Sequence, residues 1–301
     1  MCDPDSVSLL LERATLARLE RLVVLARRSP PARRRGAARA GRGIEVGARR
    51  EYAPGDDVRL VDWPAYARLE KLLVKVVEEL PEPRLDLLLD GSGSMGVGVP
   101  SPMERASLAA AALAAAATAR EVRVTVWWGG EPEARHTLGR PAELVGLLRW
   151  LAARTPRGAG RLPEAAARVA RSARGRGKAV LLTDGLEPAA GAEAARRLGS
   201  AGFDAQLVVV APSDELQADD AEAGNQAGLM VLVDAETGAR REAPFAPVAL
   251  EAARAARTAR RSELLSGLEA RGVQAEALLA GAPFEAVARG LLRTSSGRGG
   301  R

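Results

Sequence analysis

The sequence predicts an α/β fold, a doubly wound and mainly parallel sheet of the Rossmann type with helices on both faces. Two observations predict it. Four apolar runs have the character of buried strands, and alanine-rich stretches with helical spacing lie between them. Strand and helix in alternation are typical of a parallel sheet that is covered on both sides. The four strand runs are LDLLLD (85 to 90), VRVTVWW (122 to 128), KAVLLTDG (178 to 185) and DAQLVVVAP (204 to 212).

Helices are expected between these strands and before the first of them. The intervening helices are predicted at 103 to 120, 141 to 153, 163 to 174 and 188 to 200. Near the amino terminus, residues 8 to 28 repeat apolar side chains at helical spacing, which predicts an amphipathic helix.

Smaller elements are expected on both sides of this α/β region. Residues 44 to 63 contain short β-type runs around the turn signal Pro54-Gly55-Asp56. The carboxyl-terminal part predicts a hairpin at 230 to 243 and a charged helix at 247 to 271. A short strand at 273 to 279 and a last helix that ends near Arg293 are expected to follow.

These patterns suggest four regions. They are an amino-terminal helix, basic linker and small β module (1 to 80), the α/β domain (81 to 212), a hairpin and helical extension (213 to 293), and a disordered tail (294 to 301).

Composition excludes several classes of protein. No window approaches the roughly 18 consecutive apolar residues of a membrane span, and charges run through the first 25 residues, unlike a signal peptide. The only cysteine is Cys2, so no disulfide can form within one chain. We therefore expect a cytoplasmic protein.

The net charge of +6 raises nucleic acid as a possible partner. Nine arginines but only one acid lie between Arg27 and Arg50, among prolines and glycines. This segment is read first as a solvated linker and second as a contact surface for an acidic partner. Because it lacks aromatic residues for stacking on bases, nucleic-acid binding is the less favoured function.

Two aspartates directly follow two of the predicted strand runs. Asp90 follows LDLLL, and Asp184 follows KAVLLT. Ligands of such sheets bind at the carboxyl ends of the strands, so these two carboxylates are expected to converge on one site.

The loop after Asp90 reads GSGSMG (91 to 96), which matches the dinucleotide fingerprint G-x-G-x-x-G. Asp90 would repel a pyrophosphate, and VGVPSP (97 to 102) delays the helix that should hold it. Instead, Asp90, Ser92 and Ser94 offer a carboxylate and two hydroxyls at alternate positions. These oxygens suit Mg²⁺, which keeps several waters and an open position, and Asp184 could hold one of those waters.

The D-x-S-x-S loop (90 to 94), with T-D-G (183 to 185) on a later strand, resembles the metal-ion-dependent adhesion site of von Willebrand factor A domains. The segment R-E-Y-A-P-G-D-D-V-R-L-V-D-W-P-A-Y-A-R (50 to 68), followed by L-V-K (73 to 75), resembles the bacterial family called domain of unknown function 58.

This resemblance implies a non-enzymatic adaptor or assembly factor that works with a MoxR-type AAA ATPase and a client complex. It implies a contact site made of Asp90, Ser92, Ser94 and Asp184, with no small-molecule substrate. The chain has no phosphate-binding Gly-x-x-x-x-Gly-Lys-Ser/Thr motif, so it is not expected to be that ATPase.

One departure from the adhesion site concerns the metal. The family pattern takes a threonine from a second loop, where this chain has Gly160 followed by Arg161. Either Mg²⁺ binds without that hydroxyl, or the guanidinium of Arg161 pairs with Asp90 and Asp184 in the cation's place.

The signature segment 50 to 68 has a structural interpretation and two functional ones. A polar network that fixes a hairpin is expected first, with Tyr52 and Trp63 docking it on the main domain. A partner-binding face is the second interpretation, and catalysis by Asp56 and Asp57 is the third. The remaining signature side chains are Arg50, Arg59, Asp62 and Arg68.

The alternative function is a metal-dependent hydrolase that uses Asp90, Asp184, Asp56 and Asp57. It requires the four carboxylates in one concave pocket, whereas adhesion predicts Asp90 on an open rim, far from the Asp56 and Asp57 pair.

Overall fold

The computed structural model describes residues 12–28, 45–78, 84–131, 134–172, 177–210, 229–244, 247–270 and 273–278. The chain divides into two compact units. One unit, here called the module, is Ala32–Glu82; the other, the main body, consists of Met1–Pro31 and Pro83–Arg301. Each unit is described by itself.

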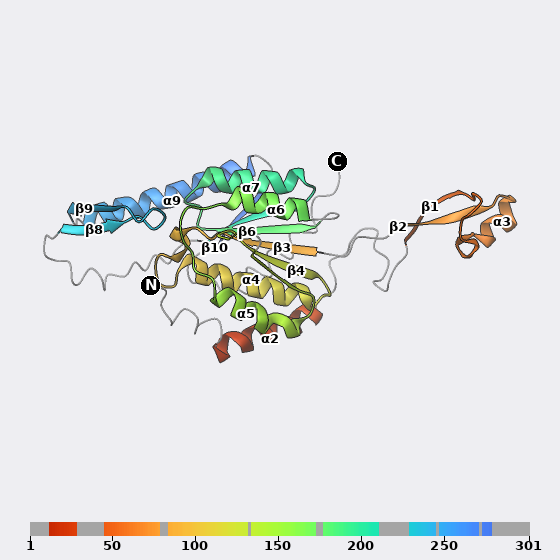
Figure 1. Ribbon diagram of the computed structural model, residues 1–301, viewed down its shortest axis with the longest axis horizontal. Coiled ribbons are helices and arrows are strands. Elements are labelled where there is room, and N and C mark those ends of the chain that lie inside the picture. The colour runs from red at the N-terminus through yellow and green to blue at the C-terminus, as the bar shows by residue number, and fades with distance from the viewer. Residues whose placement is uncertain are drawn as a thin grey trace. The chain divides into compact units, whose positions relative to one another are not determined.

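A six-stranded sheet forms the centre of the main body, in the order β10-β7-β6-β3-β4-β5 (Figure 1). All neighbouring strands are parallel except β5, which runs antiparallel to β4 at one edge. The mixed α/β architecture with a mostly parallel sheet is thus confirmed. The strands are β3 (Arg84–Leu89), β4 (Arg123–Trp128), β5 (Arg135–Leu138), β6 (Lys178–Thr183), β7 (Asp204–Val210) and β10 (Gln274–Leu278).

Helices cover both faces of this sheet, as Figure 1 shows. One face carries α2 (Arg13–Arg28), α4 (Pro102–Thr118) and α5 (Leu144–Ala152), which share one hydrophobic cluster. The other face carries α6 (Leu162–Ser172), α7 (Pro188–Ser200) and α9 (Pro247–Glu269), which share a second cluster. A hairpin of β8 (Leu229–Val233) and β9 (Arg240–Pro244) precedes α9.

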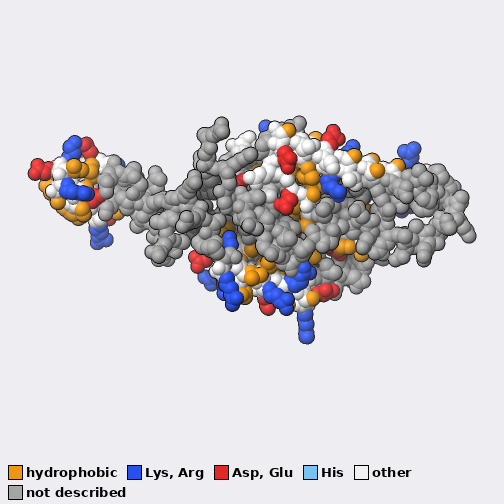
Figure 2. All heavy atoms as spheres, turned by 180° about the vertical axis from the view of Figure 1, so that it is seen from behind, with side chains coloured by type: hydrophobic (Ala, Val, Ile, Leu, Met, Phe, Trp, Pro, Cys, Tyr) orange, Lys and Arg blue, Asp and Glu red, His pale blue; other side chains and the backbone are white. Residues whose placement is uncertain are grey.

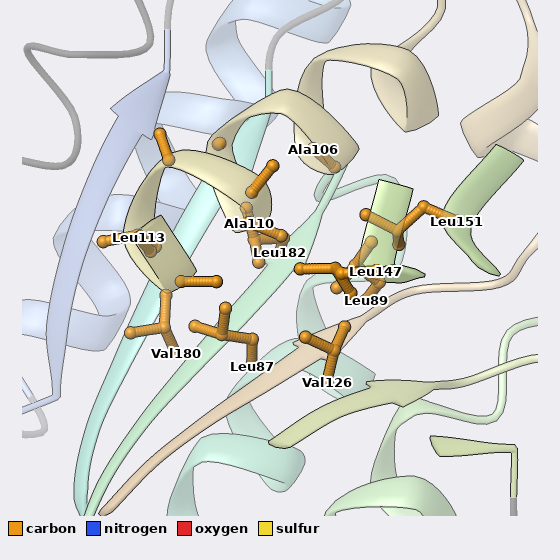
Figure 3. Packing of buried hydrophobic residues seen from close by; sticks show 14 of the residues in the cluster. Leu87, Leu89, Ala106, Ala110, Leu113, Val126, Leu147, Leu151, Val180 and Leu182 are labelled. Carbon is orange, nitrogen blue, oxygen red and sulfur yellow. The ribbon is translucent and has the colours of Figure 1, made fainter. Parts of the chain in front are cut away.

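The central helix α4 is buried on almost every side, which explains its alanine-rich sequence. Its methyl side chains let the helix lie close to the leucine and valine side chains of β3, β4 and β6 (Figure 3). Pro102 starts the helix, and Ser101 and Glu104 exchange hydrogen bonds in a capping box.

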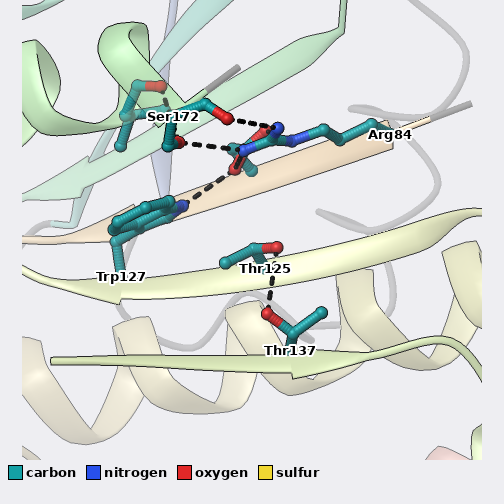
Figure 4. A network of polar contacts seen from close by, with 7 residues as sticks. Arg84, Thr125, Trp127, Thr137 and Ser172 are labelled. Atoms are coloured by element: carbon teal, nitrogen blue, oxygen red, sulfur yellow. Dashed lines mark hydrogen bonds and ion pairs between the residues drawn. The ribbon is translucent and has the colours of Figure 1, made fainter. Parts of the chain in front are cut away.

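The opposite face of β3 holds a buried acid in an otherwise apolar strand. The Asp86 carboxylate accepts two hydrogen bonds from the Arg84 guanidinium, at 2.6 and 2.7 Å, and one from Trp127 Nε1 at 2.8 Å (Figure 4). Arg84 also donates to Ser172 on α6. A buried charge needs such partners, so this network fixes β3, β4 and α6 together.

The domain division differs from the expected one at both ends. Helix α2 belongs to the main body, because Leu19 and Leu22 are buried against α4. The carboxyl-terminal extension is also part of the main body, since β10 pairs with β7 and Leu264 and Leu268 of α9 enter the second cluster. The expected last helix and the tail 294 to 301 lie outside the described residues, as does most of the basic segment.

The module contains a two-stranded antiparallel sheet and one short helix. The sheet pairs β1 (Glu45–Glu51) with β2 (Leu73–Glu78), and α3 (Trp63–Leu69) lies between them in sequence. Of the β-type runs expected at 44 to 63, one is confirmed as β1, whereas β2 follows that range and α3 was not expected. The start of α3 is set by the Asp62 side chain, which accepts from Ala65 N–H, and by Pro64.

None of the helices within the described ranges is long and apolar enough to cross a bilayer.

Candidate functional site

The candidate site lies where β3 and β6 end. These strands are hydrogen-bonded neighbours, with Leu89 opposite Leu182, so Asp90 and Asp184 follow them at the same edge of the sheet. Both side chains line one small hollow that opens to solvent. Its polar lining consists of Asp90, Ser92, Ser94, Thr183, Asp184, Glu187 and Glu236.

The glycines of the first loop are there because neighbouring backbone lies against them. A Cβ on Gly91 would collide with the backbone of Gly130, and one on Gly93 with the carbonyl of Ala235. Helix α4 starts only at Pro102, beyond the loop, so Gly96 does not open this helix. The loop therefore resembles the dinucleotide fingerprint in letters but not in structure.

A second loop is hydrogen-bonded to the first. Gly93 N–H donates to Gly158 O at 2.9 Å, and Arg157 N–H donates to Gly91 O at 3.0 Å. These bonds hold residues 157 to 160 beside the hydroxyl-bearing loop, which is where the resemblance expects a second loop.

Asp90 lies at the floor of the hollow and not on an open rim as expected, with 6% of the residue exposed. Its Oδ2 accepts from Thr183 Oγ1 at 2.8 Å, and its Oδ1 accepts from Ser92 N–H at 3.1 Å. Burial raises the pKa of Asp90 above its ordinary value; the hydrogen bond from Thr183 opposes this rise, and the negative charge of Asp184 adds to it. A positive charge in the hollow would offset this cost of burial.

The two serines and Asp184 complete the expected constellation. Ser92 Oγ and Ser94 Oγ lie 3.1 Å apart. Asp184 Oδ1 accepts from Leu186 N–H at 3.0 Å, while Asp184 Oδ2 is buried and has no hydrogen-bond partner among the residues that the structure describes. A buried carboxylate oxygen without a donor is costly, so this atom points to a ligand that supplies positive charge or a proton.

Gly160 faces the site and Arg161 does not. A Cβ on Gly160 would lie 3.6 Å from Asp90 Oδ1 and 3.5 Å from Ser92 Cβ. Leu162 is buried and lines the hollow, whereas the Arg161 side chain is exposed. Across the described residues, Arg161 forms no ion pair with Asp90 or Asp184, so it does not take the place of a cation here. The alternation of the chain directs residues 160 and 162 inward and residue 161 outward.

Sequence reasoning missed three side chains of the hollow. Thr183 belongs to the quoted T-D-G motif, and its hydroxyl was the available signal. Glu187 lies between β6 and α7, three residues after Asp184. Glu236 comes from the turn of the β8–β9 hairpin and carries no local signal that connects it with β3 or β6.

The donor set fits a hard divalent cation such as Mg²⁺. Within the described ranges no group of three or more His, Cys, Asp or Glu side chains is arranged to hold a metal ion, so hydroxyl oxygens would have to contribute. Asp90, Ser92, Ser94 and Asp184 supply carboxylate and hydroxyl oxygens, the ligands that Mg²⁺ prefers, beside an unpartnered buried oxygen.

The acids of the signature segment have structural roles within the module. Both carboxylate oxygens of Asp56 bind the Arg50 guanidinium, and Asp56 Oδ2 also accepts from Ala53 N–H at 2.8 Å. The Arg50 partner lowers the pKa of the Asp56 carboxyl. Asp57 accepts from Arg59 N–H at 2.9 Å at the start of a short 3-10 helix. Asp56 and Asp57 thus fix the hairpin loop, and no single unit contains the four carboxylates of the hydrolase alternative.

The other signature side chains are placed as follows. Tyr52 N–H donates to Leu72 O, and Arg68 Nε donates to Pro64 O at 3.2 Å. Trp63, expected to dock the module, is 58% exposed and meets Tyr66 edge to face. Figure 2 shows hydrophobic side chains open on the module's surface.

Comparison with known protein families places most of the chain in one family. A family described as protein of unknown function DUF58 matches residues 48–263. No curated protein was found to be similar to the chain.

Proposed function

Because the chain belongs to the DUF58 family of proteins of unknown function, we propose a function from its own residues. The main body is a non-enzymatic adaptor or assembly factor, which binds an exposed carboxylate of a protein partner at a cation held by Asp90, Ser92, Ser94 and Asp184. The partner that the resemblance to the domain of unknown function 58 family implies is a MoxR-type AAA ATPase that acts on a client complex.

One observation carries the proposal. Two carboxylates and two hydroxyls from two neighbouring strand ends line an open hollow, and within the described part of the chain one buried oxygen of Asp184 has no donor. Bound Mg²⁺ would supply a positive charge with an open position for an outside oxygen ligand.

The chain's own residues hold the ligands of the site in a fixed orientation. Thr183 and Ser92 N–H hold the Asp90 carboxylate in a fixed orientation at the floor of the hollow. Gly158 and Arg157 hold the second loop beside it by backbone hydrogen bonds. A preformed site of this kind loses little conformational entropy when a partner binds. The hollow contains no histidine that could serve as a general base.

The test uses the purified full chain and the MoxR-type ATPase of the same organism, in Mg²⁺ and in EDTA. We expect a complex that EDTA dissociates and that the double substitution Ser92→Ala, Ser94→Ala weakens at least about tenfold, or about 1.4 kcal/mol. The control is Ser200→Ala, an exposed serine at the end of α7.

Titration calorimetry with Mg²⁺ alone separates the two parts of the proposal. The cation site is supported if Mg²⁺ binding releases or absorbs heat in the wild type and this heat is lost in the double substitution. A complex that is equally strong in EDTA and in the double variant would show that the partner binds elsewhere.

A further inference from the structure

The β8–β9 hairpin reaches the candidate site through its turn. Gly93 of the hydroxyl-bearing loop lies so close to the carbonyl of Ala235 that a side chain at position 93 would collide with it. The next residue, Glu236, lines the same hollow as Asp90 and Asp184. The contact therefore joins two segments that are more than a hundred residues apart in the sequence.

The hairpin turn is held in one conformation by its own hydrogen bonds. Asp234 Oδ1 accepts from Glu236 N–H at 2.9 Å and from Thr237 N–H at 2.8 Å. Gly238 N–H donates to Asp234 O at 2.9 Å, and Gly238 has the positive φ of 71° that favours glycine. The backbone of Glu236 is thereby fixed relative to β8 and β9, so its place at the hollow does not depend on a loose loop.

The charged side chains that line the hollow with Glu236 are all acidic, namely Asp90, Asp184 and Glu187. Among the described residues, no lysine or arginine lines it. Packing the turn onto this loop thus brings a further carboxylate towards Asp90 and Asp184, which is unfavourable unless a cation lies among them.

We propose that the Glu236 side chain turns to the cation site when a divalent cation binds and becomes its carboxylate ligand, so that the cation fastens the hairpin turn to the loop of Asp90, Ser92 and Ser94. A partner would then bind by placing its own aspartate or glutamate where Glu236 lies. This inference rests on the proposed function. It adds that a carboxylate of the chain itself, that of Glu236, occupies the position to which the carboxylate of a partner would bind.

The experiment measures hydrogen exchange in the full chain, with Mg²⁺ and with EDTA, over residues 229 to 244. We expect Mg²⁺ to slow exchange in this hairpin at least about fivefold in the wild type. Glu236→Gln, which keeps the shape but removes the charge, is expected to abolish that change. The matched control is Glu242→Gln, an exposed glutamate on β9 of the same hairpin, which should respond to Mg²⁺ as the wild type does.

The thermal midpoint of unfolding is a second readout, and its first comparison is made without metal. In EDTA, Glu236→Gln removes a negative charge from beside Asp184 and Glu187, so we expect its thermal midpoint to lie above that of the wild type and of Glu242→Gln. Mg²⁺ should then raise the midpoint of Glu236→Gln less than it raises the wild-type midpoint.

The two proposals fail in different ways. If the hairpin of Glu236→Gln responds to Mg²⁺ as the wild type does, while Ser92→Ala, Ser94→Ala abolishes the response, the cation site stands and Glu236 is not its ligand. If the wild-type protein binds no Mg²⁺ at all, both the cation site and the role of Glu236 are overturned.

Discussion

At the scale of single residues, Gly160 limits the number of oxygen atoms that the hollow offers to a cation. Gly160 points towards Asp90 with room for a side chain, because a Cβ there would make ordinary contacts of 3.5 to 3.7 Å. Its φ is not in the left-handed region.

We therefore predict that Gly160→Ser, which adds a hydroxyl beside Asp90 Oδ1, raises the affinity for Mg²⁺ about tenfold, or about 1.4 kcal/mol. Titration calorimetry measures this, with Gly160→Ala as the control that adds the Cβ but no oxygen. Equal affinities of the serine and alanine variants would show that a hydroxyl at this position does not reach the cation.

A second prediction concerns His136, the chain's only histidine. It lies on β5 and is half-buried, with its ring centroid 5.8 Å from that of Trp150. Burial lowers the pKa of His136 below 6.5, and the charge of Glu143 opposes the shift. The imidazole C–H signals of this one histidine should thus titrate with a midpoint below 6.5 in an NMR experiment.

The sign of the linked stability change follows from this direction. Because the folded state disfavours the imidazolium, His136 adds stability above pH 6.5 that is lost as the pH falls through its folded pKa. His136→Phe should remove this part of the pH dependence in urea unfolding. An NMR midpoint at or above 6.5 would contradict both expectations.

At the scale of elements, sequence patterns predicted most of the main body. The strand runs 85 to 90 and 178 to 185 became β3 and β6 because a continuous apolar run ending in Asp suits a strand buried on both faces. The same logic placed Asp90 and Asp184 at one edge. Helix α3 was missed because W-P-A-Y-A-R-L has no buried stripe, although Asp62 and Pro64 are helix-start signals.

Other parts of the site could not be predicted from local patterns. The position of Glu236 depends on how the β8–β9 turn packs on Gly93, a contact between distant segments. The direction of Arg161 depends on which of residues 160 to 162 faces inward, and one residue of shift would have reversed it. Such tertiary choices are decided by packing, not by residue type.

Helix α4 gives the prediction at this scale. Ala110 is fully buried between the helix and the sheet (Figure 3). Ala110→Leu should lower the free energy of unfolding by about 1 to 3 kcal/mol, because added methylenes in a packed core force side chains and backbone to move. Urea denaturation measures this against Ala189→Leu, an exposed position on α7, which should stay within about 0.5 kcal/mol of the wild type.

At the scale of the whole molecule, the two units differ in how much core they bury. The side chains described in the module include only three buried hydrophobic ones, Val61, Ala65 and Val74, whereas the main body has two extensive clusters. Small units bury a smaller share of their surface and open more easily.

We therefore predict that amide exchange in residues 45 to 78 is faster than in β3, β6 and β7 by at least about a hundredfold. Exchange measured by mass spectrometry on the full chain tests this, and equal protection in both regions would show that the module unfolds together with the main body.

Helix α2 and strand β3 pack into the same core, yet the whole module lies between them in the chain. Both ends of the module are therefore joined through the chain to the main body. A protease that cuts once between α2 and β1 would leave the module joined to β3, while α2 would stay in place by its packing on α4. The nicked protein would still migrate as one particle in gel filtration, and its two fragments would separate only in denaturant.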